Sequence, residues 1–374
     1  MTNILDQTEL FKKTGLRKNI SLLIQTASET PDENNYSLIS QEFTAFYTTQ
    51  LKGKSFPPIL RFNIPAIGTE VSAGLAEDSR RVVIIGDLHS DFNSLSSILS
   101  KLALSSYDYF EKALFIFMGD YTDRGRRPIE TLRLLYALKT YLGERCILLK
   151  GNHELFSFCN GKLQPLIYPA DTYRFFNIYL SMDVNRLHSA YCDLLPYAAV
   201  INHYASVETP TDACRLLPVA SFKRYLVCHA SIPRYDYISY FDEEKLAGMT
   251  MPFDRHSDLA TATGQMVWGD PSEDVDPMWK DEVRFEFGRT EFFDFMNKNG
   301  YDLLIRGHER VEDGVKHSFD GRIITIFSTG GRDNDDSFYS LEVPDPSFAI
   351  IMEDGLIVFE RVFDSSLETH NKEV

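Results

Sequence analysis

Short apolar runs alternate with amphipathic segments in the part of the chain between residues 82 and 149. The apolar runs lie at residues 82–85, 114–118 and 146–149. Between them, residues 91–103 and 128–142 repeat apolar side chains every three or four positions, as on the buried face of a helix. Three buried strands joined by two helices predict a βαβαβ unit whose parallel strands end at one edge of a sheet.

The segments on either side of this unit complete a mixed α/β fold. Residues 1–55 are polar with one apolar stripe and predict helices. Residues 155–200 are rich in aromatic side chains and predict mainly helix, whereas the apolar runs at 225–228 and 303–305 predict two more strands. Asp-Gly pairs, which favour antiparallel hairpins, occur at residues 313–314, 320–321 and 354–355. We therefore expect an α/β fold of two sheets packed face to face and flanked by helices.

The same pattern predicts the domain organisation. Residues 1–79 are expected to form a helical N-terminal arm and a polar connector. Residues 80–362 contain the βαβαβ unit and the later strands, and are expected to form the core domain. Residues 363–374 are a polar C-terminal tail. Because the arm lies outside the predicted core, it is a candidate surface for docking a partner.

The composition is that of a globular protein and argues against two kinds of partner. The 374 residues carry a formal net charge of −16, whereas nucleic acids and anionic membranes attract clustered Lys and Arg. No apolar run approaches the ~18 residues of a membrane span, and the N-terminus lacks the order of a secretory signal. The five cysteines show no Cys-x-x-Cys spacing, which predicts buried free thiols in a reducing compartment. We expect a cytoplasmic protein.

Polar side chains follow the predicted strands at the point where each strand ends. The first three runs are followed by Gly-Asp-Leu-His, Gly-Asp-Tyr-Thr-Asp-Arg-Gly and Gly-Asn-His-Glu, and each of the two later strands is followed by a histidine. Because the ends of parallel strands converge on one crevice, we expect these side chains to form one site. The strand-end donors are Asp87, His89, Asp120, Asn152, His229 and His308.

This set of oxygen and nitrogen donors is suited to divalent metal ions. It is large enough for two ions if one carboxylate bridges them, and Asp120 is the best candidate for the bridge. Carboxylate and imidazole ligands without thiolate suit manganese, iron or zinc, with manganese as the first expectation. Two ions ~3.5–4 Å apart can activate a hydroxide for in-line attack on phosphorus, so that no covalent nucleophile is needed.

Three further residues of the same motifs are candidates for catalysis. His153 is left free beside Asn152 and is placed to protonate a leaving alkoxide. Asp123 is available to orient the His153 imidazole and hold its tautomer. Arg124 offers a two-pronged donor for phosphate oxygens, and supplies positive charge that the acidic composition otherwise lacks.

Over about residues 80–360, these motifs resemble the metal-dependent phosphoprotein phosphatases of the PPP type, within the calcineurin-like metallophosphoesterases. GDLHS is similar to the family's GDxHG, GDYTDRG to its GDxVDRG, and GNHE is identical; CHASIP, VWGDP and LIRGHERVEDG are similar to the later motifs. The resemblance implies that one metal takes Asp87, His89 and Asp120. It implies that the other takes Asp120, Asn152, His229 and His308, with His153 and Asp123 as the acid pair.

The chain also departs from the family pattern. Ser90 and Ala230 stand where the family has glycine, and residues 328–333 lack the tyrosine that borders the active site in typical members. The family's second phosphate-binding arginine is replaced by Asp281 at the ungapped position. The candidates to take over its role are Arg284, Lys280 and Arg332.

The expected function is hydrolysis of phosphoserine and phosphothreonine in protein substrates, with His153 as general acid. One alternative is protein tyrosine phosphatase activity, and another is hydrolysis of dinucleotide polyphosphates or phosphodiesters on the same scaffold. A third alternative, a binding module without activity, is disfavoured because every ligand position is filled. The arm and the departures are similar to the eukaryotic-like PPP domains of bacteria, including secreted effectors, which would act in the host cytosol.

Overall fold

The computed structural model describes residues 2–53, 56–65, 79–167, 171–207, 219–251, 257–273 and 284–363. Residues 66–78 of the predicted connector and the tail from residue 364 onward lie outside these ranges, as do Lys280 and Asp281. The division of the chain into arm, core domain and tail therefore stays a prediction.

The predicted βαβαβ unit is confirmed. Its parallel strands are β2 (Arg81–Ile85), β3 (Ala113–Phe117) and β4 (Cys146–Leu148). Its helices are α4 (Phe92–Leu104), the short α5 (Tyr109–Lys112) and α6 (Pro128–Leu142). Helix α4 begins after Asp91, whose side chain accepts a hydrogen bond of 2.9 Å from the backbone N–H of Ser94. Such a cap satisfies a donor that the first turn of a helix otherwise leaves unpaired.

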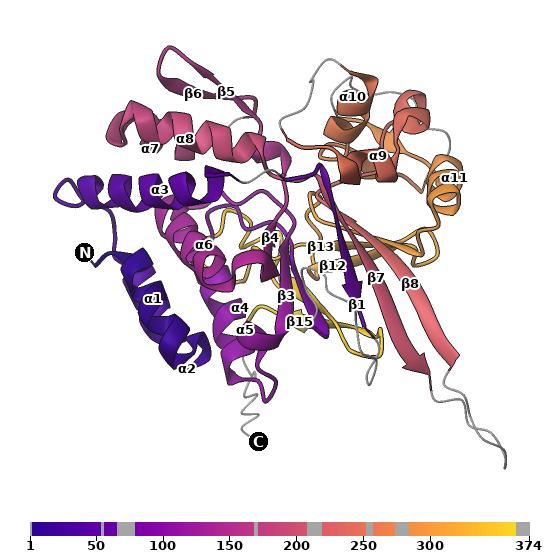
Figure 1. Cartoon of the computed structure of the whole chain (residues 1–374), viewed down its shortest axis with the longest axis horizontal. Coiled ribbons are helices and arrows are strands. Elements are labelled where there is room, and N and C mark those ends of the chain that lie inside the picture. Colours follow the sequence, from indigo (N-terminus) through magenta and orange to yellow (C-terminus); the bar gives the residue numbers. More distant parts are fainter. Residues whose placement is uncertain are drawn as a thin grey trace, which may run out of the picture.

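The structure has two main sheets (Figure 1): one contains the strands of this unit, and the other lies beside it. The five-stranded sheet has the order β15-β14-β2-β3-β4, and the six-stranded sheet has the order β1-β7-β8-β11-β13-β12. The first sheet is completed by β14 (Ser347–Ile351) and β15 (Ile357–Arg361). The second consists of β1 (Ile59–Ile64), β7 (Ala198–Val207), β8 (Val219–Cys228), β11 (Leu303–Arg306), β12 (Val315–Ser318) and β13 (Ile323–Ile326).

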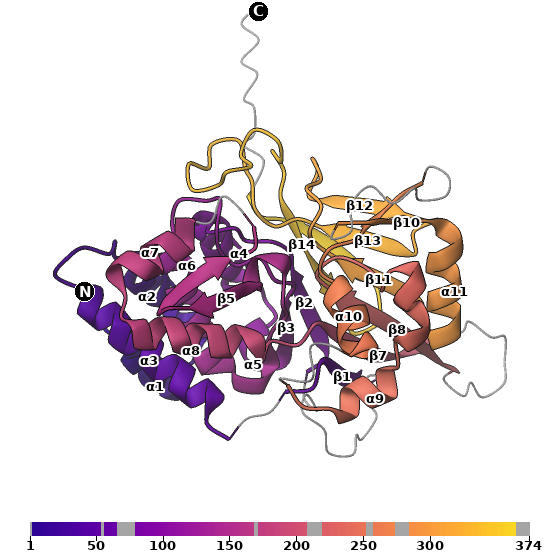
Figure 2. The ribbon, with the colours of Figure 1, turned by 90° about the horizontal axis from the view of Figure 1, so that it is seen from above.

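Successive side chains of a strand point to opposite faces, and this alternation builds a core on both faces of each sheet. Val82 and Ile84 of β2 belong to the cluster between the two sheets, whereas Val83 and Ile85 pack with the helices of the N-terminal half. In Figure 2 these helices lie on one side of the sheets, and α9, α10 and α11 lie on the other. The last three span Glu243–Gly248, Asp258–Gln265 and Arg289–Asn299. The predicted two-sheet α/β fold flanked by helices is therefore confirmed.

The helices predicted for residues 1–55 pack directly on the core. They are α1 (Ile4–Thr14), α2 (Leu16–Ala27) and α3 (Tyr36–Leu51). Their apolar side chains share one buried cluster with α6 and with the outer face of β3. Arg133 of α6 is fully buried and its guanidinium donates to both carboxylate oxygens of Glu42 of α3, at 2.8 and 3.1 Å. A buried ion pair thus joins the first three helices to the βαβαβ unit.

The segment 155–200 is only partly helical. Helices α7 (Asp171–Tyr179) and α8 (Met182–Asp193) are as predicted. The prediction is wrong for the hairpin of β5 (Phe156–Cys159) and β6 (Lys162–Pro165). Asn160 and Gly161 turn this hairpin with φ of 52° and 77°. An Asn-Gly pair is a strong hairpin signal, so the information was present in the sequence.

Two of the three Asp-Gly predictions are confirmed. The pairs at 320–321 and 354–355 turn the antiparallel hairpins β12–β13 and β14–β15. The prediction for 313–314 is wrong, because β13 lies between β11 and β12 in the sheet. Gly314 has a φ of 68° and passes so close to the chain before β14 that an added Cβ would lie 2.4 Å from the Ser347 nitrogen. This turn therefore allows the backbone at Gly314 to pass close to the backbone at Ser347.

The short elements complete the description. They are η1 (Gly143–Arg145), η2 (Asn152–Glu154), η3 (Tyr235–Tyr240), β9 (Asp270–Pro271) and β10 (Glu286–Phe287). Cys146, Cys192 and Cys228 are buried free thiols as predicted, whereas Cys159 is exposed. Among the described residues, none of the helices combines the length and apolar character needed to cross a bilayer.

Candidate active site

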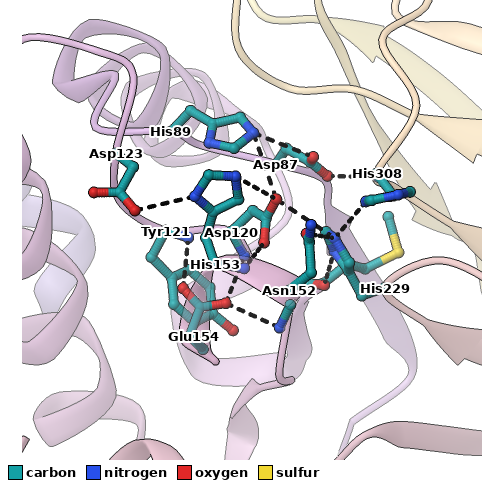
Figure 3. A network of polar contacts seen from close by, with 12 residues as sticks. Asp87, His89, Asp120, Tyr121, Asp123, Asn152, His153, Glu154, His229 and His308 are labelled. Carbon is teal, nitrogen blue, oxygen red and sulfur yellow. Dashed lines mark hydrogen bonds and ion pairs between the residues drawn. The ribbon is translucent and has the colours of Figure 1, made fainter. Parts of the chain in front are cut away.

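The six predicted metal ligands converge at the adjoining ends of the two sheets (Figure 3). Asp87 and His89 follow β2, Asp120 follows β3, and Asn152 lies in η2 after β4. The second sheet contributes His229 after β8 and His308 after β11. Because β8 and β11 run parallel, their C-terminal ends present both imidazoles at the same edge.

Backbone strain is concentrated in the turns that carry these side chains. Few residues other than glycine adopt a positive φ, because this backbone conformation costs roughly 1–2 kcal/mol per residue. Such angles occur here at His89 (45°), Ser90 (61°), Asp120 (53°), Asp123 (68°), Arg124 (69°) and His308 (71°). The turns are held by hydrogen bonds, for example from the backbone N–H groups of Leu88 and His89 to the Asp120 carbonyl oxygen at 3.1 and 2.8 Å. Strain of this kind is typical of functional sites.

Asp120 is the centre of the donor cluster. Its Oδ2 lies 3.5 Å from Nε2 of both His89 and His229. Two groups of donor atoms that lie within 4.8 Å of one another share this carboxylate: His89, Asp120 and His153 in one, and Asp120, His229 and His308 in the other. A carboxylate shared by two donor groups is the arrangement expected of a bridging ligand.

Several polar atoms of the cluster are buried close together. The side-chain amide of Asn152 lies within 3.1 Å of both carboxylate oxygens of Asp120, to which its nitrogen can donate, and 2.9 Å from Nε2 of His229. Oδ2 of Asp87 and Nε2 of His308 are buried and have no hydrogen-bond partner among the described residues. Lone pairs that converge in a buried place are unfavourable unless a cation lies among them. The residues therefore fit a site for divalent metal.

The imidazoles are held in the tautomer that a metal ligand requires. Nδ1 of His229 lies 2.9 Å from the Met118 carbonyl oxygen, and Nδ1 of His89 lies 3.2 Å from that of Thr122. Each Nδ1 can therefore donate its proton to a carbonyl, which leaves the Nε2 lone pair facing Asp120. Burial lowers the pKa of both histidines, so the neutral form is favoured.

The motif Gly151-Asn152-His153-Glu154 places a second carboxylate behind the ligands. Glu154 accepts hydrogen bonds from the backbone N–H groups of Asp120, Tyr121 and Gly151, at 2.8, 3.1 and 2.9 Å. Burial raises the pKa of Glu154 to about 7, against the effect of these three donors. An added Cβ at Gly151 would lie 2.2 Å from Oδ1 of Asp120, so this close approach requires glycine. Glu154 thus braces the strained turn at Asp120.

His153 and Asp123 form the predicted pair. Nδ1 of His153 lies 3.0 Å from Oδ2 of Asp123, and its Nε2 lies 4.0 Å from Oδ2 of Asp120. The backbone N–H of Thr172 donates to Oδ1 of Asp123 at 3.3 Å, and the Tyr173 hydroxyl donates to the His153 carbonyl at 2.6 Å. Burial lowers the pKa of His153, and the neighbouring Asp123 opposes this shift. The imidazole is therefore fixed with Nε2 directed toward the metal ligands.

A cleft of about 390 Å³ opens over this cluster. Arg124 lines it, and its Nε is buried without a hydrogen-bond partner among the described residues. Arg284 also lines the cleft and is held by two hydrogen bonds, of 2.9 and 2.6 Å, to Oδ2 of Asp270. Arg332 is exposed and is not among the described side chains that line the cleft. The geometry therefore favours Arg284 over Arg332 as the second phosphate-binding arginine, which stays a prediction.

Four residues that line the cleft were missed from the sequence: Glu309, Arg310, Phe327 and Tyr339. Arg310 stands two positions after His308, and its neighbour Glu309 lines the cleft as well. Tyr339 also lines the cleft, with its ring centroid 5.5 Å from that of His89 and 5.9 Å from the Arg124 guanidinium carbon. The missing tyrosine of residues 328–333 thus has a counterpart further along the same loop. No local pattern marks Tyr339, because only the folding of the loop brings it to the site.

Comparisons with known proteins agree with this geometry. Residues 80–312 match the model of the calcineurin-like phosphoesterases. The chain belongs to the calcineurin-like phosphoesterase family. It is 28% identical over 285 residues to a probable serine/threonine-protein phosphatase of Encephalitozoon cuniculi, which covers 74% of this chain and 54% of that relative. The chain thus spans about half the length of this relative.

The solved structures show the same fold. A protein serine/threonine phosphatase of Saccharomyces cerevisiae superposes with a TM-score of 0.60 at 19% identity, over 93% of this chain and 95% of that one. The superposition therefore extends beyond the part of the chain that matches the calcineurin-like phosphoesterase model. The family uses divalent metals, and the donor cluster around Asp120 is its candidate metal centre in this chain.

The two positions at which the family pattern has glycine differ in this calcineurin-like phosphoesterase. Ser90 is buried at a φ of 61° and its hydroxyl has no hydrogen-bond partner among the described residues, whereas Ala230 is buried and is not among the positive-φ residues. We expect Ser90→Gly to raise the free energy of unfolding by about 0.5–1 kcal/mol, because glycine relieves the strain. Ala230→Gly should lower it by a similar amount. Urea denaturation measures both, and a shift in the same direction for the two variants would contradict this interpretation.

Proposed function

We propose that the protein is a phosphoprotein phosphatase that hydrolyses phosphoserine and phosphothreonine monoesters. The observation that carries this proposal is the His153–Asp123 pair directed at a cluster of lone-pair donors in a cleft that Arg124 and Arg284 line. Hydrolysis of a phosphate monoester needs both kinds of group: positive charge to bind the phosphate oxygens, and an acid to protonate the leaving group. The serine/threonine phosphatase relative of Encephalitozoon cuniculi supports the same substrate class.

In the proposed mechanism, the ligands Asp87, His89, Asp120, Asn152, His229 and His308 would hold two divalent ions, with manganese as the expected metal. Bound there, the ions would supply Lewis-acid activation of water and charge for the phosphoryl oxygens. Arg124 binds the phosphate by a bidentate contact and keeps it in line for attack. His153 gives the proton on Nε2 to the leaving oxygen, while Asp123 holds Nδ1 and stabilises the protonated ring.

A panel of substrates tests this function. Peptides carrying phosphoserine, phosphothreonine or phosphotyrosine are incubated with the Mn-loaded protein beside a dinucleotide polyphosphate, and phosphate release is measured. We expect release from the phosphoserine and phosphothreonine peptides, and a loss of at least ~100-fold for Asp120→Asn, which replaces the central carboxylate by a neutral amide. Cleavage of the dinucleotide polyphosphate without release from any peptide would refute the proposal.

Tyrosine phosphatase activity is an outcome of the same panel. The aromatic side chains that line the cleft are Phe327 and Tyr339, and a preference for the phosphotyrosine peptide would show that they bind the longer phenol. The expectations of a secreted effector, of a cytoplasmic location and of a docking role for residues 1–55 stay predictions.

A further inference from the structure

We propose that residues 338–342, together with Arg310, form a docking rim that binds an apolar side chain of the substrate next to its phosphorylated residue. The proposal rests on the proposed phosphoprotein phosphatase function and adds to it a preference for the sequence around the phosphate. The rim is part of the loop between β13 and β14, and it adjoins the catalytic cleft on one side.

Contacts at both ends of residues 338–342 place this segment at the mouth of the cleft. Tyr339 lines the cleft itself. Glu342 forms an ion pair with Arg310, which also lines the cleft. Leu341 stands between these two anchored positions, and the Phe338 ring lies in edge contact with the Tyr339 ring at 5.2 Å between centroids. Phe338 and Leu341 are not themselves among the residues that line the cleft, but each is next in sequence to a residue that lines it or pairs with its lining.

The loop that carries the rim is held firmly to the catalytic turns. The side-chain amide of Asn334 donates to both carboxylate oxygens of Asp91, at 2.9 and 2.8 Å, and Asp91 lies two residues after His89. The backbone N–H of Arg126 donates to the Asp336 carbonyl at 3.0 Å, which ties the loop to the turn that carries Arg124. A loop with these anchors needs little ordering when a ligand binds, so contacts with it add directly to affinity.

The two apolar side chains of the rim are exposed. Phe338 is 56% exposed and Leu341 is 91% exposed, whereas Tyr339 between them is 6% exposed. On a mobile loop such side chains could turn inward, but the anchors at Asn334 and Asp336 and the Val343 N–H bond of 2.8 Å to the Tyr339 carbonyl oppose this. Exposed apolar side chains held in place beside a catalytic cleft are typical of a binding surface.

The substrate chain is the occupant that the geometry favours. A phosphorylated side chain can enter the cleft only if its own backbone lies across the opening. An extended peptide advances ~3.3 Å per residue, so a side chain one to three positions from the phosphorylated residue lies within about 3–10 Å of it along the chain. Side chains at these positions are therefore the ones that can contact a surface next to the cleft. The other conceivable occupants, a second copy of this chain or a separate partner, make no use of the adjoining cleft.

Matched phosphopeptides and rim variants test the proposal. Two phosphoserine peptides are compared that differ only in the three residues after the phosphoserine, which contain leucine and phenylalanine in one peptide and serine in the other. We expect the Mn-loaded protein to favour the apolar peptide by about tenfold in kcat/KM, chiefly through KM, as partial burial of one or two apolar side chains allows. Phe338→Ser/Leu341→Ser should abolish the preference and leave turnover of p-nitrophenyl phosphate, which has no flanking chain, unchanged.

Leu104→Ser is the matched control, because Leu104 at the end of α4 is 85% exposed and is not among the residues that line the cleft. It should keep the full preference. The proposal is overturned if the two peptides react equally, or if the rim variant keeps the preference. It is also overturned if size-exclusion chromatography shows that the rim variant changes the oligomeric state without changing KM. Hydrolysis of both peptides without preference refutes the rim alone, whereas no hydrolysis of either peptide refutes the proposed function as well.

Discussion

Replacing His153 by asparagine should lower kcat for phosphoserine peptides by about 10²–10⁴, the usual contribution of a general acid. The physical reason is that a serine alkoxide is a poor leaving group unless it is protonated as the bond to phosphorus breaks. The same variant should lose much less activity with p-nitrophenyl phosphate, because p-nitrophenolate is stable as an anion. Steady-state kinetics on both substrates, with saturating Mn, measure the difference.

The structure provides the control for this experiment. Two hydrogen bonds that hold His153 in place use its backbone, one from its N–H to Asp120 at 2.9 Å and one from the Tyr173 hydroxyl to its carbonyl, so both survive the substitution. Asp123→Asn should show the same dependence on leaving group with a smaller loss, because the ring stays but loses the carboxylate charge that stabilises its protonated form. Equal losses on both substrates, with metal content unchanged, would rule out His153 as the proton donor.

The second large effect is expected on stability. Glu42→Ala should lower the free energy of unfolding by about 3–5 kcal/mol, because it leaves the fully buried Arg133 guanidinium without its counter-charge. Glu42 also accepts a hydrogen bond of 2.8 Å from the backbone N–H of Ile4, so the start of α1 loses its anchor as well. Urea denaturation followed by circular dichroism measures the change.

An exposed ion pair in α1 serves as the comparison for the buried one. Lys12 and Glu9 of α1 form an ion pair of 2.6 Å, with side chains 45% and 69% exposed. Glu9→Ala should cost less than about 0.5 kcal/mol, since water screens such pairs. The double variant Glu42→Leu/Arg133→Met removes both charges and should be more stable than Glu42→Ala. It should not recover fully, because Arg133 also donates to the carbonyl oxygens of Thr2, Thr26 and Ala27. A cost for Glu42→Ala no larger than that for Glu9→Ala would contradict this account.

Most of the candidate site was predictable because its chemistry lies in short motifs at strand ends. The spacing of apolar residues and the local composition identify the strands. Parallel pairing then requires the C-terminal ends of these strands to lie together. The positions of Asp87, Asp120 and Asn152 followed from these two steps. His229 and His308 required one further assumption, that the second sheet packs with its strand ends at the same edge. Their Nε2 to Nδ1 distance of 3.1 Å agrees with it.

The rest of the site could not be predicted, because it depends on loops whose paths no local rule determines. The sequence offered Arg284, Lys280 and Arg332 as equal candidates for the second phosphate-binding residue, and only the lining of the cleft distinguishes Arg284 from Arg332. Tyr339 reaches the cleft because Asn334 binds Asp91, a contact between residues 243 positions apart. Such long-range contacts carry no periodic signal.

By itself, the sequence determined which candidate residues stand at the strand ends and which strands bring them together, since apolar periodicity and strand-end motifs are local properties. The tertiary structure alone decided three other things. It packs the first three helices on the core through the buried pair of Glu42 and Arg133. It places Tyr339 and Arg310 at the cleft, and it leaves Phe338 and Leu341 exposed beside it. Burial and exposure are properties of the whole packed chain. For these side chains, no local pattern in the sequence predicts them.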